Sequence, residues 1–119
     1  MAKIIVADDA MFMRATLKKT LTEAGHEVIG EAGNGAEAVA LFEKVNPDLL
    51  LMDITMPEMD GLAALATIMG AHPEARIIMC TALGQENKVK EALAAGARDY
   101  VVKPFQGAKL LDAVTRALS

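Results

Sequence analysis

Five polar side chains that could take part in a chemical reaction lie at the ends of short apolar runs. They are the pair Asp8 and Asp9 after KIIVA, Asp53 after DLLLM, Thr81 after RIIMC, and Lys103 after DYVV. Three carboxylates held close together repel one another and raise one another's pKa values, so such a cluster is normally kept for a cation. Oxygen ligands without His or Cys favour Mg²⁺ over zinc. The pattern therefore predicts an Mg²⁺ site that is available to a phosphate.

In a site of this kind, the residues would take different chemical roles. A carboxylate can attack phosphorus and become an acyl phosphate, and Asp53 is the best candidate because it lies centrally among the others. Mg²⁺ and Lys103 would neutralise the charge on the transferring oxygens. The Thr81 hydroxyl could donate a hydrogen bond to a phosphoryl oxygen. We therefore expect Asp53, Lys103 and Thr81 to carry the chemistry, with Asp8 and Asp9 beside the metal.

Each of these residues also has a simpler structural explanation. Asp9 could cap the helix that follows it, and Asp8 could be a solvated loop residue. Thr81 could end a strand for steric reasons, and Lys103 could be surface charge. Taken singly, the simple explanation is favoured for Asp8, Thr81 and Lys103, and is about even for Asp9 and Asp53. Taken together, the five residues favour a site.

The elements that must position these residues alternate along the chain. The apolar runs cover residues 3–7, 27–32, 48–52, 76–80 and 99–102. Between them, apolar residues recur at helical spacing, as in the set Leu62, Leu65, Ala66 and Met69. Strands separated by helices predict parallel pairing with right-handed crossovers. We therefore expect an α/β fold, a five-stranded parallel sheet between two layers of helices.

The composition of the runs predicts the strand order. Runs 3–7, 48–52 and 76–80 are nearly all apolar, as central strands should be, whereas run 27–32 alternates and run 99–102 is short. The order 2-1-3-4-5 fits this division and is the flavodoxin-like one, which binds ligands at the carboxyl ends of the strands. The five polar side chains should therefore meet at one edge of the sheet.

The sequence also marks where helices begin and end. Gly25 and Gly96 lie where helix C-caps are expected, and Asn34 with Glu37 has the spacing of a capping box. Asp60 before Gly61 is typical of a helix cap, and we assign it no chemistry. The four prolines all fall between the predicted elements.

Composition limits the classes of protein and partner. With 119 residues, 53% of them hydrophobic and only 3% aromatic, the chain should form one domain with an aliphatic core. The net charge of -4 argues against direct nucleic-acid contacts and against an anionic membrane surface. The single cysteine, Cys80, excludes an internal disulfide and favours a reducing compartment. No leader or apolar stretch of about 20 residues is present, so we expect a cytoplasmic protein.

The chain resembles the receiver domains of bacterial two-component response regulators over essentially its full length, so we expect one domain that spans residues 1–119. Four short motifs carry this resemblance. They are DD at 8–9, DITMPEMDG at 53–61, TA at 81–82 and KPF at 103–105. The resemblance implies that a histidine kinase phosphorylates Asp53. It implies that Asp9, Asp53 and the backbone carbonyl of Thr55 bind Mg²⁺, with Asp8 assisting through water. It further implies that Thr81 and Tyr100 move on phosphorylation and that the Lys103–Pro104 bond is cis.

Within that family, the segments DDAMFMR and TALGQENKVKEALAAGARDYVVKPF look most like the stand-alone chemotaxis regulators. This likeness implies docking on a flagellar motor switch protein through residues 86–118, and it allows a phosphatase as a further partner. Because the sequence stops at Ser119, soon after the last predicted helix, we expect a receiver without an output domain. Lys109 and Arg116 are the only cations of the last predicted helix, so a docking surface that relied on a basic patch would be weaker here. The resemblance also implies that Thr55 and Leu83, at positions that vary within the family, affect how quickly the acyl phosphate is lost.

Three alternatives remain open. The chain could be the receiver of another two-component pathway, or a fragment of a longer regulator with a DNA-binding output. It could be a phosphatase with an Asp nucleophile, although Thr55 stands where such enzymes usually carry a second carboxylate. It could be a flavin-binding module, although Asp8 and Asp9 would repel a phosphate at the end of the first strand. The expectation is a phosphoacceptor switch and not an enzyme that turns over a substrate.

Overall fold

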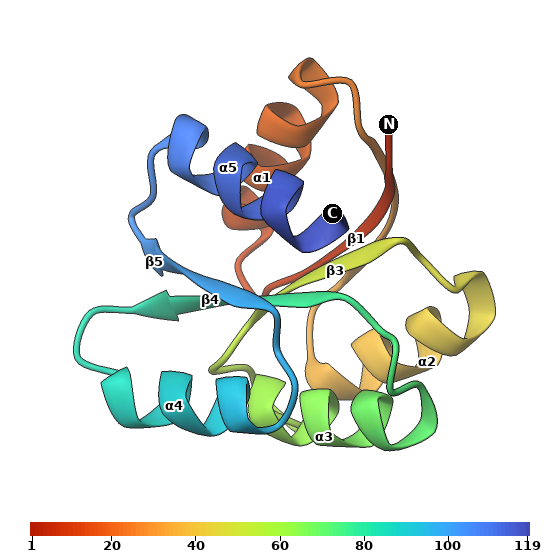
Figure 1. Ribbon diagram of the computed structural model, residues 1–119, viewed down its shortest axis with the longest axis vertical. Helices are drawn as coiled ribbons and strands as arrows, with labels where there is room; N and C mark the ends of the chain where they lie inside the picture. The colour runs from red at the N-terminus through yellow and green to blue at the C-terminus, as the bar shows by residue number, and fades with distance from the viewer.

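The computed structural model describes residues 1–119, in which five β-strands alternate with five α-helices (Figure 1). The strands are β1 (Lys3–Ala7), β2 (Glu27–Ala32), β3 (Leu49–Asp53), β4 (Ile77–Ala82) and β5 (Asp99–Lys103). The helices are α1 (Met11–Glu23), α2 (Gly35–Val45), α3 (Gly61–Ala71), α4 (Glu86–Ala94) and α5 (Gly107–Leu118). All strands pair in parallel in the order β2-β1-β3-β4-β5, which confirms the predicted flavodoxin-like sheet.

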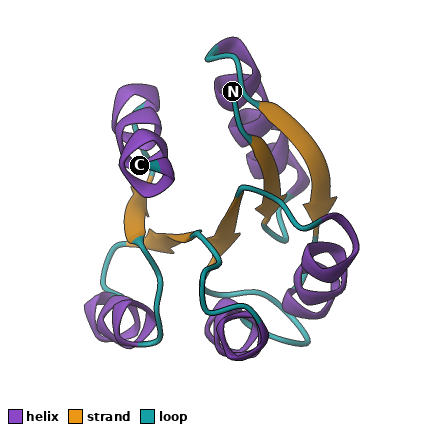
Figure 2. Cartoon of the chain, turned by 45° about the vertical axis from the view of Figure 1, so that its right-hand side comes forward, coloured by secondary structure: helices purple, strands orange, loops and turns teal.

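The helices cover both faces of the sheet. Helices α1 and α5 lie on one face, and α2, α3 and α4 lie on the other (Figures 1 and 2). Because successive strand residues point to opposite faces, β3 serves both layers: Leu50 and Met52 join the core under α2, α3 and α4, while Leu49 and Leu51 join the core under α1 and α5. The molecule is therefore the predicted three-layer α/β/α arrangement.

The burial of the strands matches their predicted places in the sheet. Every residue of β3 is buried, and β1 and β4 each have a single exposed residue, at the start and the end of the strand respectively. The outer strands β2 and β5 are only partly buried. Purely apolar runs therefore become central strands, and the mixed runs become edges.

Two of the central strands extend further toward their carboxyl ends than predicted. Run 48–52 becomes Leu49–Asp53, and run 76–80 becomes Ile77–Ala82. The ladder continues because Asp53 pairs in register with Cys80, and Ala82 pairs with Lys103. The predicted ends were placed where the apolar runs meet a polar side chain, but the backbone hydrogen bonds of the sheet continue past these positions. Asp53 and Thr81 consequently belong to the sheet itself, which holds them rigidly.

The predicted helix boundaries are largely confirmed. Gly25 and Gly96 have φ values of +91° and +112°, the left-handed conformation that glycine adopts readily just beyond a helix. Asn34 Oδ1 accepts a hydrogen bond from the Glu37 backbone N at 2.9 Å. The Glu37 carboxylate accepts from the Gly33 backbone N, so only half of the predicted capping box forms.

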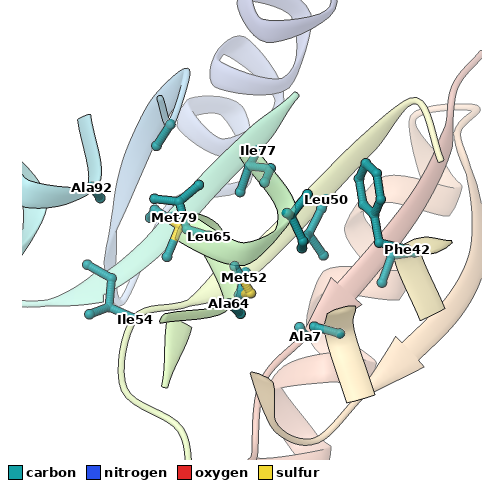
Figure 3. Close-up of a cluster of buried hydrophobic side chains, with 14 of the residues drawn as sticks. Ala7, Phe42, Leu50, Met52, Ile54, Ala64, Leu65, Ile77, Met79 and Ala92 are labelled. Carbon is teal, nitrogen blue, oxygen red and sulfur yellow. The ribbon is translucent and has the colours of Figure 1, made fainter. Parts of the chain in front are cut away.

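The buried face of helix α3 is shifted from the one that spacing predicted, although Leu65 is common to both and Leu62 and Met69 still pack against the core. Ala64, Leu65 and Ile68 are buried, whereas Leu62 is only half-buried and Ala66 is exposed. Figure 3 shows Ala64 and Leu65 in the core beside Met52 and Met79. Helix α3 is the most apolar of the five helices, so its periodicity is weak. No helix of the chain has both the length and the apolar character needed to cross a bilayer.

Candidate functional site

The carboxyl ends of four strands bring the predicted residues to one edge of the sheet. We call this group of five residues the rim: Asp8, Asp9, Asp53, Thr81 and Lys103. Asp8 directly follows β1, Asp53 and Lys103 are the last residues of β3 and β5, and Thr81 is the penultimate residue of β4. The parallel register keeps these strand ends level, because Met52 pairs with Ala7 and Asp53 pairs with Cys80.

The Lys103 ammonium bridges two carboxylates of the rim. Its Nζ lies 2.6 Å from Asp8 Oδ2 and 3.2 Å from Asp53 Oδ2. The side chain therefore reaches from the edge strand β5 across the end of β4 to β3 and β1. The Lys103–Pro104 bond is cis, as the resemblance implied. Lys103 is thus no surface charge, and its simple explanation is wrong.

Burial and pairing shift the pKa values of this pair. Burial raises the pKa of Asp53, and the charge of Asp8 adds to the effect, while Lys103 opposes it; the net shift is upward. Burial by itself lowers the pKa of Lys103, but the hydrogen bond to Asp8 and the two carboxylate charges outweigh it, so the net shift is also upward. Lys103 is therefore fully charged near neutral pH.

Asp8 is a buried and fully engaged member of the rim. Only 1% of its surface is exposed. Its Oδ1 accepts a hydrogen bond from the Ala10 backbone N at 2.9 Å, and Oδ2 accepts from Lys103. The idea of a solvated loop residue is therefore wrong for Asp8. The capping role considered for Asp9 is also wrong, because Ala10 is the N-cap of α1 and no side chain caps that helix.

The three carboxylates form a group that could hold a metal ion. One oxygen each from Asp8, Asp9 and Asp53 lies within 4.8 Å of the others. When all are ionised, one ammonium against three carboxylates leaves two negative charges, the balance that a divalent cation supplies. Hard oxygen donors of this number suit Mg²⁺. The Thr55 backbone N donates a hydrogen bond to Asp53 Oδ1 at 3.4 Å, so the loop that carries the Thr55 carbonyl lies directly beside the group.

Helix α3 begins against the end of β3 and fixes the intervening loop. Gly61 is required there, because a Cβ atom at this position would collide with the backbone carbonyl of Asp53. The Gly61 backbone N donates to the Ile54 carbonyl at 2.7 Å. Asp60 Oδ1 accepts from the Ala63 backbone N at 2.9 Å, which confirms its predicted capping role. The loop after Asp53 is therefore closed at both of its ends.

The two predicted switch residues lie on neighbouring strands. Thr81 is 1% exposed, and Tyr100 on the edge strand β5 is 43% exposed. Both line one hollow of about 360 Å³ between the start of α4 and the end of the sheet. The Thr81 hydroxyl is hydrogen bonded to Gln85 Oε1 at 2.8 Å.

Sequence reasoning missed two residues that support the rim. Arg14 donates from a terminal guanidinium nitrogen to the Asp8 carbonyl at 2.6 Å and from Nε to Glu31 at 3.1 Å, which ties the loop after β1 to β2. Gln85 binds Thr81 and also donates to Thr55 Oγ1 at 3.0 Å. The only available signals were their places in DDAMFMR and TALGQ, since a polar residue in a loop or first helical turn is otherwise unremarked.

Comparisons with known proteins point to one family. Residues 4–115 match the family model of the response regulator receiver domain. The chain is similar to the chemotaxis protein CheY of Listeria monocytogenes, with 50% identity over 98% of each chain. It is also similar to the transcriptional regulatory protein PdtaR of Mycobacterium tuberculosis, with 41% identity over 98% of this chain and 57% of that protein.

A solved structure of a related protein agrees with these sequence comparisons. The crystal structure of the CheX-CheY-BeF3-Mg+2 complex from Borrelia burgdorferi contains a chain that is 38% identical to this one. The match has a TM-score of 0.93 and covers 98% of this chain and 89% of the other. The fold of this chain thus also occurs in a solved protein of related sequence.

Proposed function

Since the chain belongs to the response regulator receiver family, we propose that it is a switch in which Asp53 accepts a phosphoryl group from a histidine kinase. The observation that carries this proposal is the Lys103 ammonium held between Asp8 and Asp53. Of these two, Asp53 is the buried last residue of the central strand β3, which holds its carboxylate at the edge of the sheet. Residues 1–119 would act as one receiver domain.

In the transfer step, an Asp53 carboxylate oxygen attacks phosphorus and the bond from phosphorus to the donor imidazole nitrogen breaks. The bonding electron pair returns to the imidazole, which then takes a proton from water, and Asp53 becomes an acyl phosphate. Lys103 neutralises charge on the transferring oxygens, because its Nζ already lies 3.2 Å from Asp53 Oδ2. Thr81 would donate to a phosphoryl oxygen.

The cluster of three carboxylates fits Mg²⁺, because its donor atoms are oxygens and its net negative charge balances a divalent cation. Asp9, Asp53 and the Thr55 carbonyl would hold the ion, with Asp8 engaged through water. When bound, the ion would supply further neutralisation of charge on the phosphoryl oxygens. The Borrelia relative was solved with both BeF3 and Mg²⁺, which supports this assignment.

The test is incubation with Mg²⁺ and acetyl phosphate, followed by measurement of the mass of the intact chain. We expect one phosphoryl adduct on the parent chain and none on Asp53→Asn. An adduct that persists in Asp53→Asn would refute the assignment of Asp53. Continued turnover of an added phosphate ester, far beyond one equivalent, would support the phosphatase alternative.

The output of the switch would be protein binding at the face made by α4, β5 and α5, with a flagellar motor switch protein as the target. The CheY relatives support chemotaxis. Tyr100 and Leu83 are large exposed apolar groups on or next to this face. Arg116 is paired with Asp99 at 3.0 Å, so Lys109 is the only cation of α5 without a salt bridge. Binding there would depend on apolar contacts more than on a basic patch.

A binding measurement separates chemotaxis from other pathways. We expect phosphorylated chain to bind an immobilised flagellar motor switch protein more tightly than unmodified chain does. Equal binding of both forms would contradict the motor assignment. The likeness to PdtaR, of which this chain covers 57%, keeps a receiver of a transcriptional pathway as the second candidate. Phosphorylation of Asp53 without any motor binding would favour that candidate.

A further inference from the structure

The side chain of Gln85 joins the loops that follow β3 and β4. Gln85 is the N-cap residue of α4, yet it makes no side-chain cap hydrogen bond. Its Oε1 accepts from Thr81 Oγ1 at 2.8 Å and from the Ala82 backbone N at 3.0 Å. Its Nε2 donates to Thr55 Oγ1 at 3.0 Å. The Gln85 side chain is therefore turned toward the rim and not toward the backbone of its own helix.

The orientation of the Gln85 amide follows from its partners. A backbone N–H can only donate, so the atom that faces the Ala82 N must be the amide oxygen. The amide nitrogen then has to face Thr55. The same oxygen accepts the Thr81 hydroxyl proton, because an amide oxygen can accept two hydrogen bonds. All three contacts are thus mutually consistent.

The Thr81 hydroxyl has one proton and can give it to one strong acceptor at a time. In this structure the proton is directed to Gln85, with the Ala82 carbonyl at 3.2 Å as the weaker alternative. A phosphoryl oxygen on Asp53 could take this proton only if Thr81 released Gln85. The hydrogen bond between Thr81 and Gln85 therefore belongs to the unphosphorylated arrangement alone.

Building on the proposed transfer to Asp53, we propose that Gln85 is a positioning residue that clamps the Thr81 hydroxyl in the unphosphorylated arrangement. A contact made in only one of two states shifts the equilibrium between them by its own free energy. The net value of one hydrogen bond corresponds to about threefold to tenfold in such an equilibrium. Loss of Gln85 should therefore destabilise the unphosphorylated chain and favour the loaded chain.

The test uses beryllofluoride with Mg²⁺ as the probe, on the full chain. The variants are Gln85→Leu, which keeps the volume, and Gln85→Ala, which shows whether any effect comes from the added apolar bulk. Gln106→Leu is the matched control, because Gln106 is the exposed N-cap of α5 and its side chain makes no hydrogen bond. For each chain we measure the melting temperature with and without the probe, and the probe concentration at half-saturation.

We expect both Gln85 variants to lose more melting temperature relative to the parent when free than when loaded, because the contacts to Ala82 and Thr55 are lost in both states and the contact to Thr81 only in the free one. The probe concentration at half-saturation should fall about threefold to tenfold. Gln106→Leu should change neither the melting temperature nor this concentration. Equal loss of melting temperature in both states, with unchanged half-saturation, would show that Gln85 only stabilises the loop and would overturn the clamp. A rise in half-saturation would overturn it as well.

The two proposals can fail separately in this experiment. Loading of the parent chain tests the proposed function, whereas the difference between variant and parent tests the clamp. A parent chain that does not load would overturn both proposals. A parent that loads normally beside variants with unchanged half-saturation would overturn the clamp alone.

Discussion

At the scale of single residues, the three carboxylates of the rim sit in different environments. Asp8 is buried and has hydrogen-bond partners for both oxygens, whereas Asp9 is exposed. Asp53 lies between them, buried but sharing Lys103 with Asp8 at the longer distance of 3.2 Å. The group that is least compensated for its burial is therefore the proposed nucleophile, and its pKa is raised. The site carries an electrostatic cost in the unphosphorylated chain.

That cost predicts that Asp53→Asn is more stable than the parent at pH 7, by about 1 kcal/mol. A carboxyl whose folded pKa is raised binds protons more readily in the folded chain, so its penalty is full above the folded pKa and vanishes below the ordinary value of 3.8. Asparagine keeps an oxygen that can accept from Lys103. The measurement is urea unfolding of both chains between pH 7 and pH 3.5. A difference that grows on acidification would contradict the argument.

Lys103→Met should have the opposite effect on stability, because it leaves Asp8 buried without its cation. Removing one partner of a buried pair is strongly destabilising, and we expect a loss of about 2 kcal/mol or more in the free energy of unfolding at pH 7. Lys109→Met on α5, whose ammonium makes no salt bridge, is the matched control and should change stability by less than about 0.5 kcal/mol. Equal values for the two variants in denaturant unfolding would contradict the bridging role.

The residues of the rim could be predicted from sequence because each one ends an apolar run, and parallel strands end at one edge. The environment of each residue could not. Whether Asp8 is solvated or buried depends on Lys103, which lies 95 positions away along the chain. Gln85 looked like an ordinary helix-start residue, and only its three hydrogen-bond partners distinguish it. A local sequence pattern does not show which residues far apart along the chain will pair in the folded structure.

At the scale of elements, the strands were easier to predict than the helix faces. A strand in the middle of a parallel sheet needs only an apolar run, and β1, β3 and β4 provide one each. Helix α3 is apolar almost all round, so several faces fit the spacing equally well. Tertiary packing selected Ala64, Leu65 and Ile68. The boundaries of β3 and β4 shifted because backbone pairing continues through polar side chains.

The contact between the start of α3 and the end of β3 should be intolerant of even one methyl group. In Gly61→Ala the Cβ would collide with the Asp53 carbonyl and the Ile54 Cα atom, which should cost about 1–3 kcal/mol and slow phosphorylation of Asp53. Gly70→Ala in the same helix has nothing within 4 Å of the new Cβ and should stabilise the chain by about 0.5–1 kcal/mol. Thermal unfolding and the acetyl phosphate assay measure both effects. A Gly61→Ala chain as stable as Gly70→Ala would refute the close packing.

At the scale of the whole molecule, the sheet gathers charge at one edge that no nearby cation fully balances. The acidic residues of the rim come from two separate segments, the loop after β1 and the end of β3, and only the fold brings them within 4.8 Å. Anything that binds this group in the folded chain and not in the unfolded chain must stabilise the fold as a whole. Global stability is therefore a readout of the site that does not depend on phosphorylation.

Mg²⁺ should raise the melting temperature of the parent chain without any phosphoryl donor. By mass action, a ligand at 100 times its Kd adds about 2.7 kcal/mol to the free energy of unfolding. Asp9→Asn removes one exposed ligand and should lose most of this Mg²⁺-dependent gain, while its stability without Mg²⁺ changes little. Asp112→Asn, which removes an equal charge on α5 outside the acidic group, should keep the full gain and so separates ligation from net charge. An equal Mg²⁺ effect in Asp9→Asn and Asp112→Asn would mean that the ion acts by screening alone, and would contradict a metal site at the rim.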